Sequence, residues 1–297
     1  MNRRRFIHQL IPFFMVPALT NLGELGAFAS QLPKTPRMPV LFLGHGSPMN
    51  AIEENVFVKG FRDIAKEIPT PKAILCLSAH WYISGTKVTS MAMPQTIHDF
   101  YGFPPELHQK KYPAPGSPEL AKTIQEFLGN EVVELDESWG LDHGAWSVLC
   151  HLYPNANIPV IQLSIDQRKD PSWHFDLSHR LKSLRDRGIL IVGSGNIIHH
   201  LGKVDFSKIN EVGFGYDWAH EANSWVHQKL NDLDWNAFLH YQKQGRAVQL
   251  AVPTPEHFLP LIYSLGLTDQ DELIETFNDH LIAGSLSMTS LKIGGIN

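Results

Sequence analysis

Four histidines lie near the ends of apolar segments, where the chain turns. His45 and His80 follow the runs PVLFL and AILCL, and His199 follows the run GILIV. His257 comes shortly after a fourth segment, AVQLAV. Imidazole binds metals and titrates near neutral pH, so such a set suits metal binding or acid–base chemistry. The chain has 16 histidines but only 2 cysteines, which favours imidazole over thiolate ligands.

The apolar segments themselves predict an α/β fold. Short apolar runs bounded by glycine or proline are typical of buried strands, and longer segments with helical character lie between them. The predicted strands are 39–43, 73–77, 158–163, 188–192 and 247–252, and the predicted helices are 51–67, 144–151, 173–187 and 217–231. This alternation predicts a single domain with a central, mostly parallel or mixed sheet and helices on both faces.

The predicted sheet explains how distant histidines could meet. In open α/β sheets, ligands bind beyond the carboxyl ends of the strands, so we expect the four imidazoles at that edge, around a metal site. For His257, Thr254 as N-cap and Pro255 at the first helical position predict a place in the first turn of a helix. Taken singly, a histidine beside a glycine turn is more often a hydrogen-bonding loop residue than a ligand.

Residues 92–116 form a connection that is longer than usual for a compact domain. Loops of this length are usually functional or disordered. Prolines and six aromatic or histidine side chains predict an ordered lid: His98, Phe100, Tyr101, Phe103, His108 and Tyr112. After the loop, Ser117 is predicted to cap a helix that begins at Pro118.

The first 29 residues predict an export signal. Arg3 and Arg4, followed by one residue and then by Phe6 and Ile7, resemble the twin-arginine pattern. The apolar stretch Leu10–Leu19 is too short to span a bilayer, and Ala27-Phe28-Ala29 matches an A-x-A cleavage site. A membrane-anchoring start is the alternative. Cleavage there would leave residues 30–297 as the mature domain, with a periplasmic location.

Composition and motifs exclude several other classes of function. A net charge of −5 and a pI near 6.3 argue against nucleic acid or an anionic membrane surface as partner. The sequence has no G-x-G-x-x-G nucleotide fingerprint and no P-loop, and neither Ser47 nor Ser194 lies in a G-x-S-x-G elbow. Cys76 and Cys150 are typical of small buried residues, and whether they pair is left open.

Eight motifs, in order along residues 38–295, resemble one known family. They are LFLGHGSPMN, LSAHWY, TIHDFYGFP, YPAPGSPELA, LDHGAWSVL, GSGNIIHHL, TPEHFLPL and GSLSM. The resemblance is to the class III, LigB-like extradiol ring-cleavage dioxygenases, and within them to the 4,5-DOPA dioxygenase branch. It implies a non-haem metalloenzyme that opens a catechol-type ring with O₂. The export segment departs from the cytoplasmic members of that family.

The resemblance also implies a set of metal ligands. Carried over motif by motif, it makes His45, His80 and His257 the ligands of one divalent ion. Fe(II) is expected for dioxygenase activity, and Zn(II) is an alternative occupant. Glu256, beside His257, is interpreted as an acid favoured by the dipole of a helix N-terminus and not as a ligand.

Other residues receive catalytic or substrate-binding roles from the same resemblance. His199 resembles the family's acid–base residue, and His143 resembles a second pocket histidine that positions substrate or O₂. His200 is interpreted as a neighbour of the site. The residues expected to contact the aromatic substrate are His98, Trp81, Tyr101 and Trp146, with Phe100 as a further candidate for the apolar wall.

Two alternatives remain at this point. A zinc-dependent hydrolase on the same fold could use His199 or Glu256 to activate a metal-bound water, because three histidines and an open position also suit zinc. A non-catalytic periplasmic binder of metal or of phenolic ligands is the other. The expected partners are a small catechol, O₂ and the export machinery, with no nucleic acid and no stable membrane insertion after signal removal.

Overall fold

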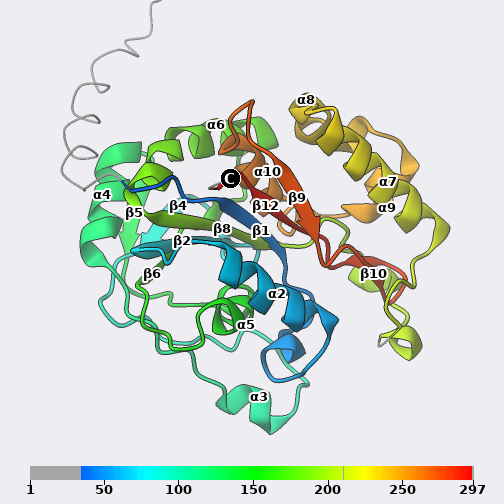
Figure 1. The fold of residues 1–297 in the computed structure, drawn as a ribbon, viewed down its shortest axis with the longest axis horizontal. Helices are drawn as coiled ribbons and strands as arrows, with labels where there is room; N and C mark the ends of the chain where they lie inside the picture. Colours follow the sequence, from blue (N-terminus) through cyan, green and yellow to red (C-terminus); the bar gives the residue numbers. More distant parts are fainter. Residues whose placement is uncertain (1–34, 210, 296–297) are drawn as a thin grey trace, which may run out of the picture.

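The computed structural model describes residues 35–209 and 211–295, with a six-stranded sheet at the centre (Figure 1). The strands lie in the order β6-β2-β8-β1-β12-β9. Their bounds are β1 Val40–Gly44, β2 Ala73–Ser78, β6 Val160–Gln162, β8 Ile189–Gly195, β9 Ile274–Phe277 and β12 Ser290–Ile293. The predicted signal, residues 1–29, lies outside the described residues and stays a prediction.

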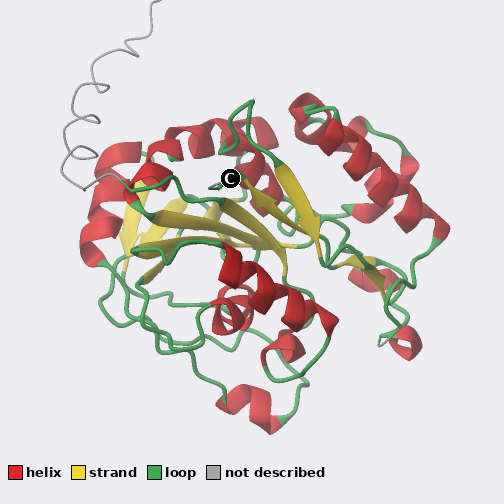
Figure 2. Ribbon diagram, viewed as in Figure 1, coloured by secondary structure: helices red, strands yellow, loops and turns green. Residues whose placement is uncertain are grey.

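Helices and small two-stranded sheets surround the central sheet (Figure 2). The paired short strands are β3 Tyr82–Ile83 with β7 Ile165–Asp166, β4 Thr86–Thr89 with β5 Val133–Asp136, and β10 Leu281–Ile282 with β11 Leu286–Ser287. The α-helices are α2 Val56–Glu67, α3 Pro105–Gln109, α4 Pro118–Leu128, α5 His143–Leu152, α6 Pro171–Arg180, α7 Asp217–Asn231, α8 Trp235–Leu239, α9 Arg246–Ala251 and α10 Leu259–Gly266. The 3₁₀ helices are η1 Pro48–Ala51, η2 Lys182–Arg187, η3 Leu201–Lys203, η4 Phe206–Lys208 and η5 Tyr241–Lys243.

The sheet is mixed, and its parallel strands end at the same edge. β6, β2, β8 and β1 run parallel, whereas β12 is antiparallel to β1 and to β9. Ser194 in β8 lies opposite both Leu43 in β1 and Ser78 in β2. The carboxyl ends of these three central strands therefore lie level with one another, as the predicted site requires.

The central strands are buried on both faces, which explains their continuous apolar sequence. In β1, Val40 and Phe42 belong to one core and Leu41 and Leu43 to the other, because successive side chains point to opposite faces. Helices α4, α6 and α10 cover the first face, and α2 and α5 cover the second (Figure 1). The predicted α/β domain with helices on both sides is confirmed.

The predicted strand at 247–252 is wrong, because this segment is helix α9. Its buried residues Ala247, Val248 and Ala251 share one helical face. This helical spacing cannot be recognised in so short an apolar run. The helix predicted to begin at Pro255 begins instead at Leu259, so His257 lies in the turn before α10. Thr254 is not its N-cap, since its hydroxyl hydrogen-bonds the Glu256 carboxylate.

The long connection 92–116 is ordered, as predicted. It contains the short helix α3 and buries Phe100, Leu107 and Tyr112, whose hydroxyl donates to the Tyr153 carbonyl. Ser117 caps α4 by accepting from the Leu120 amide. Cys76 and Cys150 are both buried and both free. Within the part of the chain that the structure describes, no helix has the length and apolar character to cross a bilayer.

A buried histidine away from the sheet edge makes the stability depend on pH. Burial lowers the pKa of His174 in α6 to about 4, and its Nδ1 lies 2.9 Å from the Tyr263 hydroxyl. Between pH 6.5 and 4 the unfolded chain therefore binds the additional proton, and stability falls as the pH is lowered through this range. We expect this histidine to contribute a loss of up to roughly 3 kcal/mol.

Urea unfolding of the wild type and of His174→Asn at pH 7, 6 and 5 measures this effect. The difference in unfolding free energy between the two proteins should shift in favour of the variant as the pH falls. The asparagine keeps a polar group near Tyr263 but does not titrate. Parallel pH dependences in the two proteins would show that His174 does not cause the loss.

Candidate metal centre

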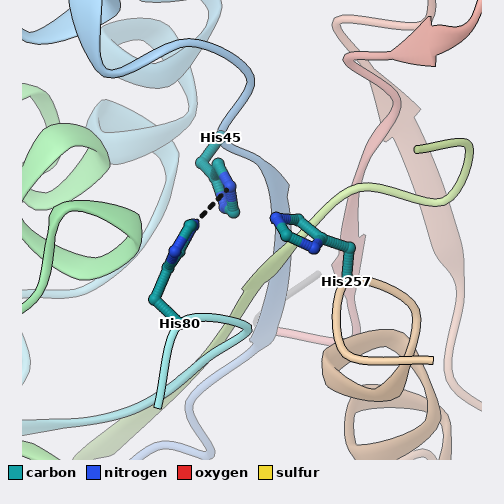
Figure 3. Close-up of side chains that lie close together, drawn as sticks. All are labelled: His45, His80 and His257. Atoms are coloured by element: carbon teal, nitrogen blue, oxygen red, sulfur yellow. Dashed lines mark hydrogen bonds between the residues drawn. The ribbon is translucent and has the colours of Figure 1, made fainter. Parts of the chain in front are cut away.

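Three of the predicted histidines meet at the carboxyl edge of the sheet. His45 directly follows β1, His80 lies two residues after β2, and His257 lies in the turn before α10. Their rings point toward one another, and the Nε2 atoms of His45 and His80 are 3.3 Å apart (Figure 3). The three ring centroids are separated by 5.1, 5.3 and 5.2 Å, and one nitrogen of each ring lies within 4.8 Å of the others.

In each of these rings, Nδ1, the nitrogen that faces away from the cluster, lies next to an oxygen atom. His45 Nδ1 is 3.0 Å from Ser194 Oγ, which itself donates to the Gly144 carbonyl and so accepts from the histidine. His80 Nδ1 lies 3.2 Å from Asp99 Oδ2, and His257 Nδ1 lies 3.2 Å from Glu256 Oε1. Ionised carboxylates only accept, so a proton on each Nδ1 satisfies these contacts and leaves each Nε2 lone pair available to a metal.

This donor set fits a divalent metal ion. Lone pairs that face one another at 3.3 Å repel unless a cation or a proton lies between them. Burial, and then the neighbouring histidines, lower the pKa of His45 and of His257 well below the ordinary value, so both rings are neutral at pH 7. Neutral imidazoles with the other nitrogen held by an oxygen are the usual form of a histidine ligand. Asp99 and Glu256 place negative charge just outside the three rings.

His143 lies beside the cluster as the first residue of α5. Its ring centroid is 3.8 Å from that of His80, and its Nδ1 is 3.0 Å from Asp99 Oδ2. Its backbone N–H donates to Asp99 Oδ1 at 2.9 Å. Asp142 caps the helix through the Ala145 amide and also accepts from the Ser78 hydroxyl at the end of β2. The start of α5 is therefore bonded to the end of β2, two residues before His80.

His199 lies on the other side of the cluster. Its ring stacks on His257 with centroids 3.5 Å apart and planes 12° apart. Burial lowers the pKa of His199 to about 4, against the opposing effect of Glu256, so the ring is neutral at pH 7 and able to accept a proton. It lies outside the group formed by His45, His80 and His257, although its nitrogen also lies close to Glu256 and His257.

A family model with a known activity matches nearly the whole domain. The model described as the catalytic LigB subunit of aromatic ring-opening dioxygenase covers residues 34–289. The chain belongs to this family. All three clustered histidines and both flanking ones, His143 and His199, fall within the matched range.

Proteins similar to this LigB-family chain show to which branch of the family it belongs. The 4,5-DOPA dioxygenase extradiol of Escherichia coli K12 is 45% identical over 262 residues, which cover 87% of this chain and 95% of the relative. The protein of the same name from Beta vulgaris is 37% identical over 257 residues, or 84% and 94% of the two chains. A solved structure of an uncharacterized E. coli K12 protein has a TM-score of 0.75 and 42% identity, covering 87% of this chain and 100% of that one. This chain is therefore a non-haem extradiol ring-opening dioxygenase of the 4,5-DOPA dioxygenase branch.

The residues predicted to contact substrate in this dioxygenase are spread over different environments. Trp81 is buried and stacks on Trp139, and Trp146 is fully buried with its Nε1 donating to the Ile97 carbonyl. His98 Nε2 lies 2.8 Å from the Lys110 carbonyl oxygen, whereas the Tyr101 side chain is 93% exposed. None of these four side chains is in ring contact with the three clustered histidines among the described residues.

Sequence reasoning missed the residues that orient the ring nitrogens. Asp99 was not singled out, although it stands within the TIHDFYGFP motif, and Ser194 was considered only as a nucleophile. The interpretation of Glu256 as a helix-dipole acid is wrong, because Glu256 precedes α10 and its carboxylate faces His257 Nδ1. A search for acidic residues in the same motifs as the histidines would have found Asp99.

A hollow elsewhere in the dioxygenase is not the candidate site. It has a volume of about 310 Å³ and lies at the opposite edge of the sheet, beside Pro39 and Gly294. Charged side chains line it, but Arg37 and Lys292 are each paired with acidic groups there.

Gly144 leaves no room for a side chain next to the cluster. A Cβ at this position would lie 2.4 Å from Ser78 Oγ and 2.8 Å from His80 Cδ2. Gly144→Ala must therefore displace the His80 ring or the start of α5. We expect about 1–3 kcal/mol of destabilisation and a metal affinity lowered by roughly 10–100-fold, as for loss of an orienting partner.

Titration of the metal-free protein with Zn²⁺, together with thermal unfolding, measures both effects. Gly202→Ala is the matched control, because a Cβ there meets nothing closer than 3.4 Å and should leave the metal affinity unchanged. A wild-type affinity in Gly144→Ala would show that the position of His80 does not depend on this close contact.

Proposed function

We propose that this dioxygenase opens the ring of DOPA or a close catechol relative, with Fe(II) held by His45, His80 and His257. The observation that carries the proposal is the convergence of one ring nitrogen from each of three histidines whose Nδ1 atoms all lie next to oxygens. When bound, Fe(II) supplies a centre at which the two catechol oxygens and O₂ can meet. The names of relatives that cover most of the chain at 45% and 37% identity support DOPA as the first substrate to test.

Side chains around the cluster would accept protons from the substrate and offset the charge of the metal ion. His199, neutral at pH 7, would accept a proton from a catechol hydroxyl at its ring nitrogen. His143 would contact the substrate or O₂ from the opposite side, next to His80. The carboxylates of Asp99 and Glu256 offset part of the cation's charge, which tunes how strongly a catecholate is attracted.

Oxygen uptake after anaerobic reconstitution tests this function. The protein loaded with Fe²⁺ is compared with the protein loaded with Zn²⁺, using DOPA, protocatechuate and catechol. Fe²⁺-dependent uptake with a yellow ring-opened product, fastest with DOPA, is the expected result. Turnover that is equal with either metal, or absent with every catechol in metal-loaded protein, would contradict the assignment of Fe(II) or of the substrate class.

We further propose that the protein acts in the periplasm after twin-arginine export. The support is the sequence pattern of residues 1–29, with its paired arginines and its A-x-A site. Cell fractionation of the wild type, and of a form with Arg3 and Arg4 replaced by lysine, tests the location. Periplasmic protein that begins at Ser30, and its loss in the lysine form, are expected, whereas wild-type protein confined to the cytoplasm would refute export.

A further inference from the structure

One carboxylate is shared by two histidines of different kinds. Asp99 Oδ2 lies 3.2 Å from Nδ1 of His80, a member of the cluster, and 3.0 Å from Nδ1 of His143, which lies outside it. The other oxygen, Oδ1, accepts from the His143 backbone N–H at 2.9 Å. Three nitrogens of two histidines therefore converge on this carboxylate: the backbone N–H is hydrogen-bonded to Oδ1, and the two ring nitrogens lie at ion-pair distance from Oδ2.

We propose that Asp99 is a positioning residue that fixes the tautomer of both His80 and His143, and so couples metal binding to the substrate side of the site. The role of His143 toward substrate rests on the proposed function, whereas the effect on His80 and on metal affinity does not.

The long loop holds this carboxylate in place. The Ile97 amide donates to the Leu141 carbonyl, and the Trp146 indole donates to the Ile97 carbonyl. Phe100 packs against His143 with ring centroids 5.5 Å apart. Residues on both sides of Asp99 are thus attached to α5 or to the segment just before it. The carboxylate is presented in a fixed orientation, which is what control of a tautomer requires.

An amide cannot replace this carboxylate. If the oxygen of asparagine takes the place of Oδ2, its NH₂ group faces the His143 backbone N–H, donor against donor. If the amide is turned round, the NH₂ group faces both Nδ1 atoms, and both rings must carry the proton on Nε2 instead. A protonated Nε2 cannot bind a metal, so His80 would lose its function as a ligand, and His143 would present a donor where it had presented an acceptor.

Glu256 provides a matched control. Its Oε1 accepts from Thr254 Oγ1 at 2.8 Å and faces Nδ1 of His257 at 3.2 Å. One oxygen serves both contacts, so the amide oxygen of Glu256→Gln can keep them while the charge is removed. Asp99→Asn removes the same charge and also the acceptor geometry. Comparison of the two variants separates an effect of charge from an effect of the tautomer.

The experiment measures imidazole nitrogens and metal affinity in the full chain. Long-range ¹H–¹⁵N spectra of the metal-free protein report which ring nitrogen carries the proton, and competition titration gives the affinity for Zn²⁺. In Asp99→Asn we expect two histidines to change from the Nδ1–H to the Nε2–H form, with an affinity lower by about 10–100-fold. Glu256→Gln should keep the wild-type tautomers and lose less affinity.

A second variant keeps the test valid if Asp99→Asn does not fold. Asp99→Glu keeps a carboxylate and should retain the Nδ1–H forms and recover part of the affinity.

A kinetic measurement tests the coupling between metal binding and the substrate side of the site. In the Fe²⁺-loaded protein, Asp99→Asn should raise KM and lower kcat, and both changes should be smaller in a His143→Ala background than in the wild type. Unchanged tautomers and Zn²⁺ affinity in Asp99→Asn would overturn the proposal. Tautomer changes without any catechol turnover in the wild type would uphold it and refute the proposed function instead.

Discussion

Replacing His45, His80 or His257 with alanine is expected to remove the bound metal and the ring-opening activity together. The three rings meet with one nitrogen each within 4.8 Å, so each substitution takes away one of three ligands. Loss of a partner that merely orients a ligand costs about 10–100-fold in affinity, and loss of the ligand itself should cost more. Elemental analysis after dialysis, with oxygen uptake on the same samples, measures both quantities.

His80→Ala is the most informative of the three variants. The His80 side chain is 19% exposed, whereas His45 and His257 are buried, so its removal should disturb the fold least. The space it leaves is open to solvent, and added imidazole is expected to restore part of the metal content and the activity. His151→Gln is the control, because this buried histidine bonds the Asn50 carbonyl and is not one of the three converging rings, so the metal content should be unchanged. Full metal content in any of the alanine variants would remove that residue from the ligand set.

The position of the site could be predicted because it depends on where buried strands end, and continuous apolar runs in the sequence indicate those ends. Strands such as Val40–Gly44 and Ala73–Ser78 are buried on both faces, so their apolar runs are continuous and end visibly at Gly44 and Ser78. Residues just beyond parallel strands must come to one edge of the sheet. The error at 247–252 arose because six residues are too few to distinguish a buried helix from a strand by periodicity.

The orienting contacts could not be predicted because they depend on side-chain directions across long sequence separations. Ser194 reaches His45 from β8 only because the register places Ser194 opposite Leu43. Asp99 comes from a loop that offers no regular period from which its direction could be inferred. The burial of Trp146 could not be predicted either, because the packing around α5 brings together residues that are far apart in the sequence.

His199→Ala is expected to keep the metal and the fold but to lower kcat by about 10²–10⁴-fold, the usual contribution of an acid–base group. The reason is its position: its ring stacks on His257 but lies outside the three-histidine group, and it is neutral at pH 7 because burial lowers its pKa to about 4. It can therefore accept a proton without being needed to hold the metal. Single-turnover oxygen uptake with DOPA under saturating Fe²⁺ measures the change.

Two further variants separate the proton role of His199 from its packing. His199→Phe keeps an aromatic ring against His257 but has no nitrogen, so it should be as slow as the alanine variant while retaining metal affinity. His200→Ala should have nearly wild-type turnover, because His200 packs near Trp218, with ring centroids 6.2 Å apart, and not against the cluster. If His199→Phe turned over as fast as the wild type, the ring would act only by supporting His257. If His199→Ala lost its metal while His199→Phe kept it, the stacking would be what holds His257 in place, and the rate of His199→Phe alone would report the proton role.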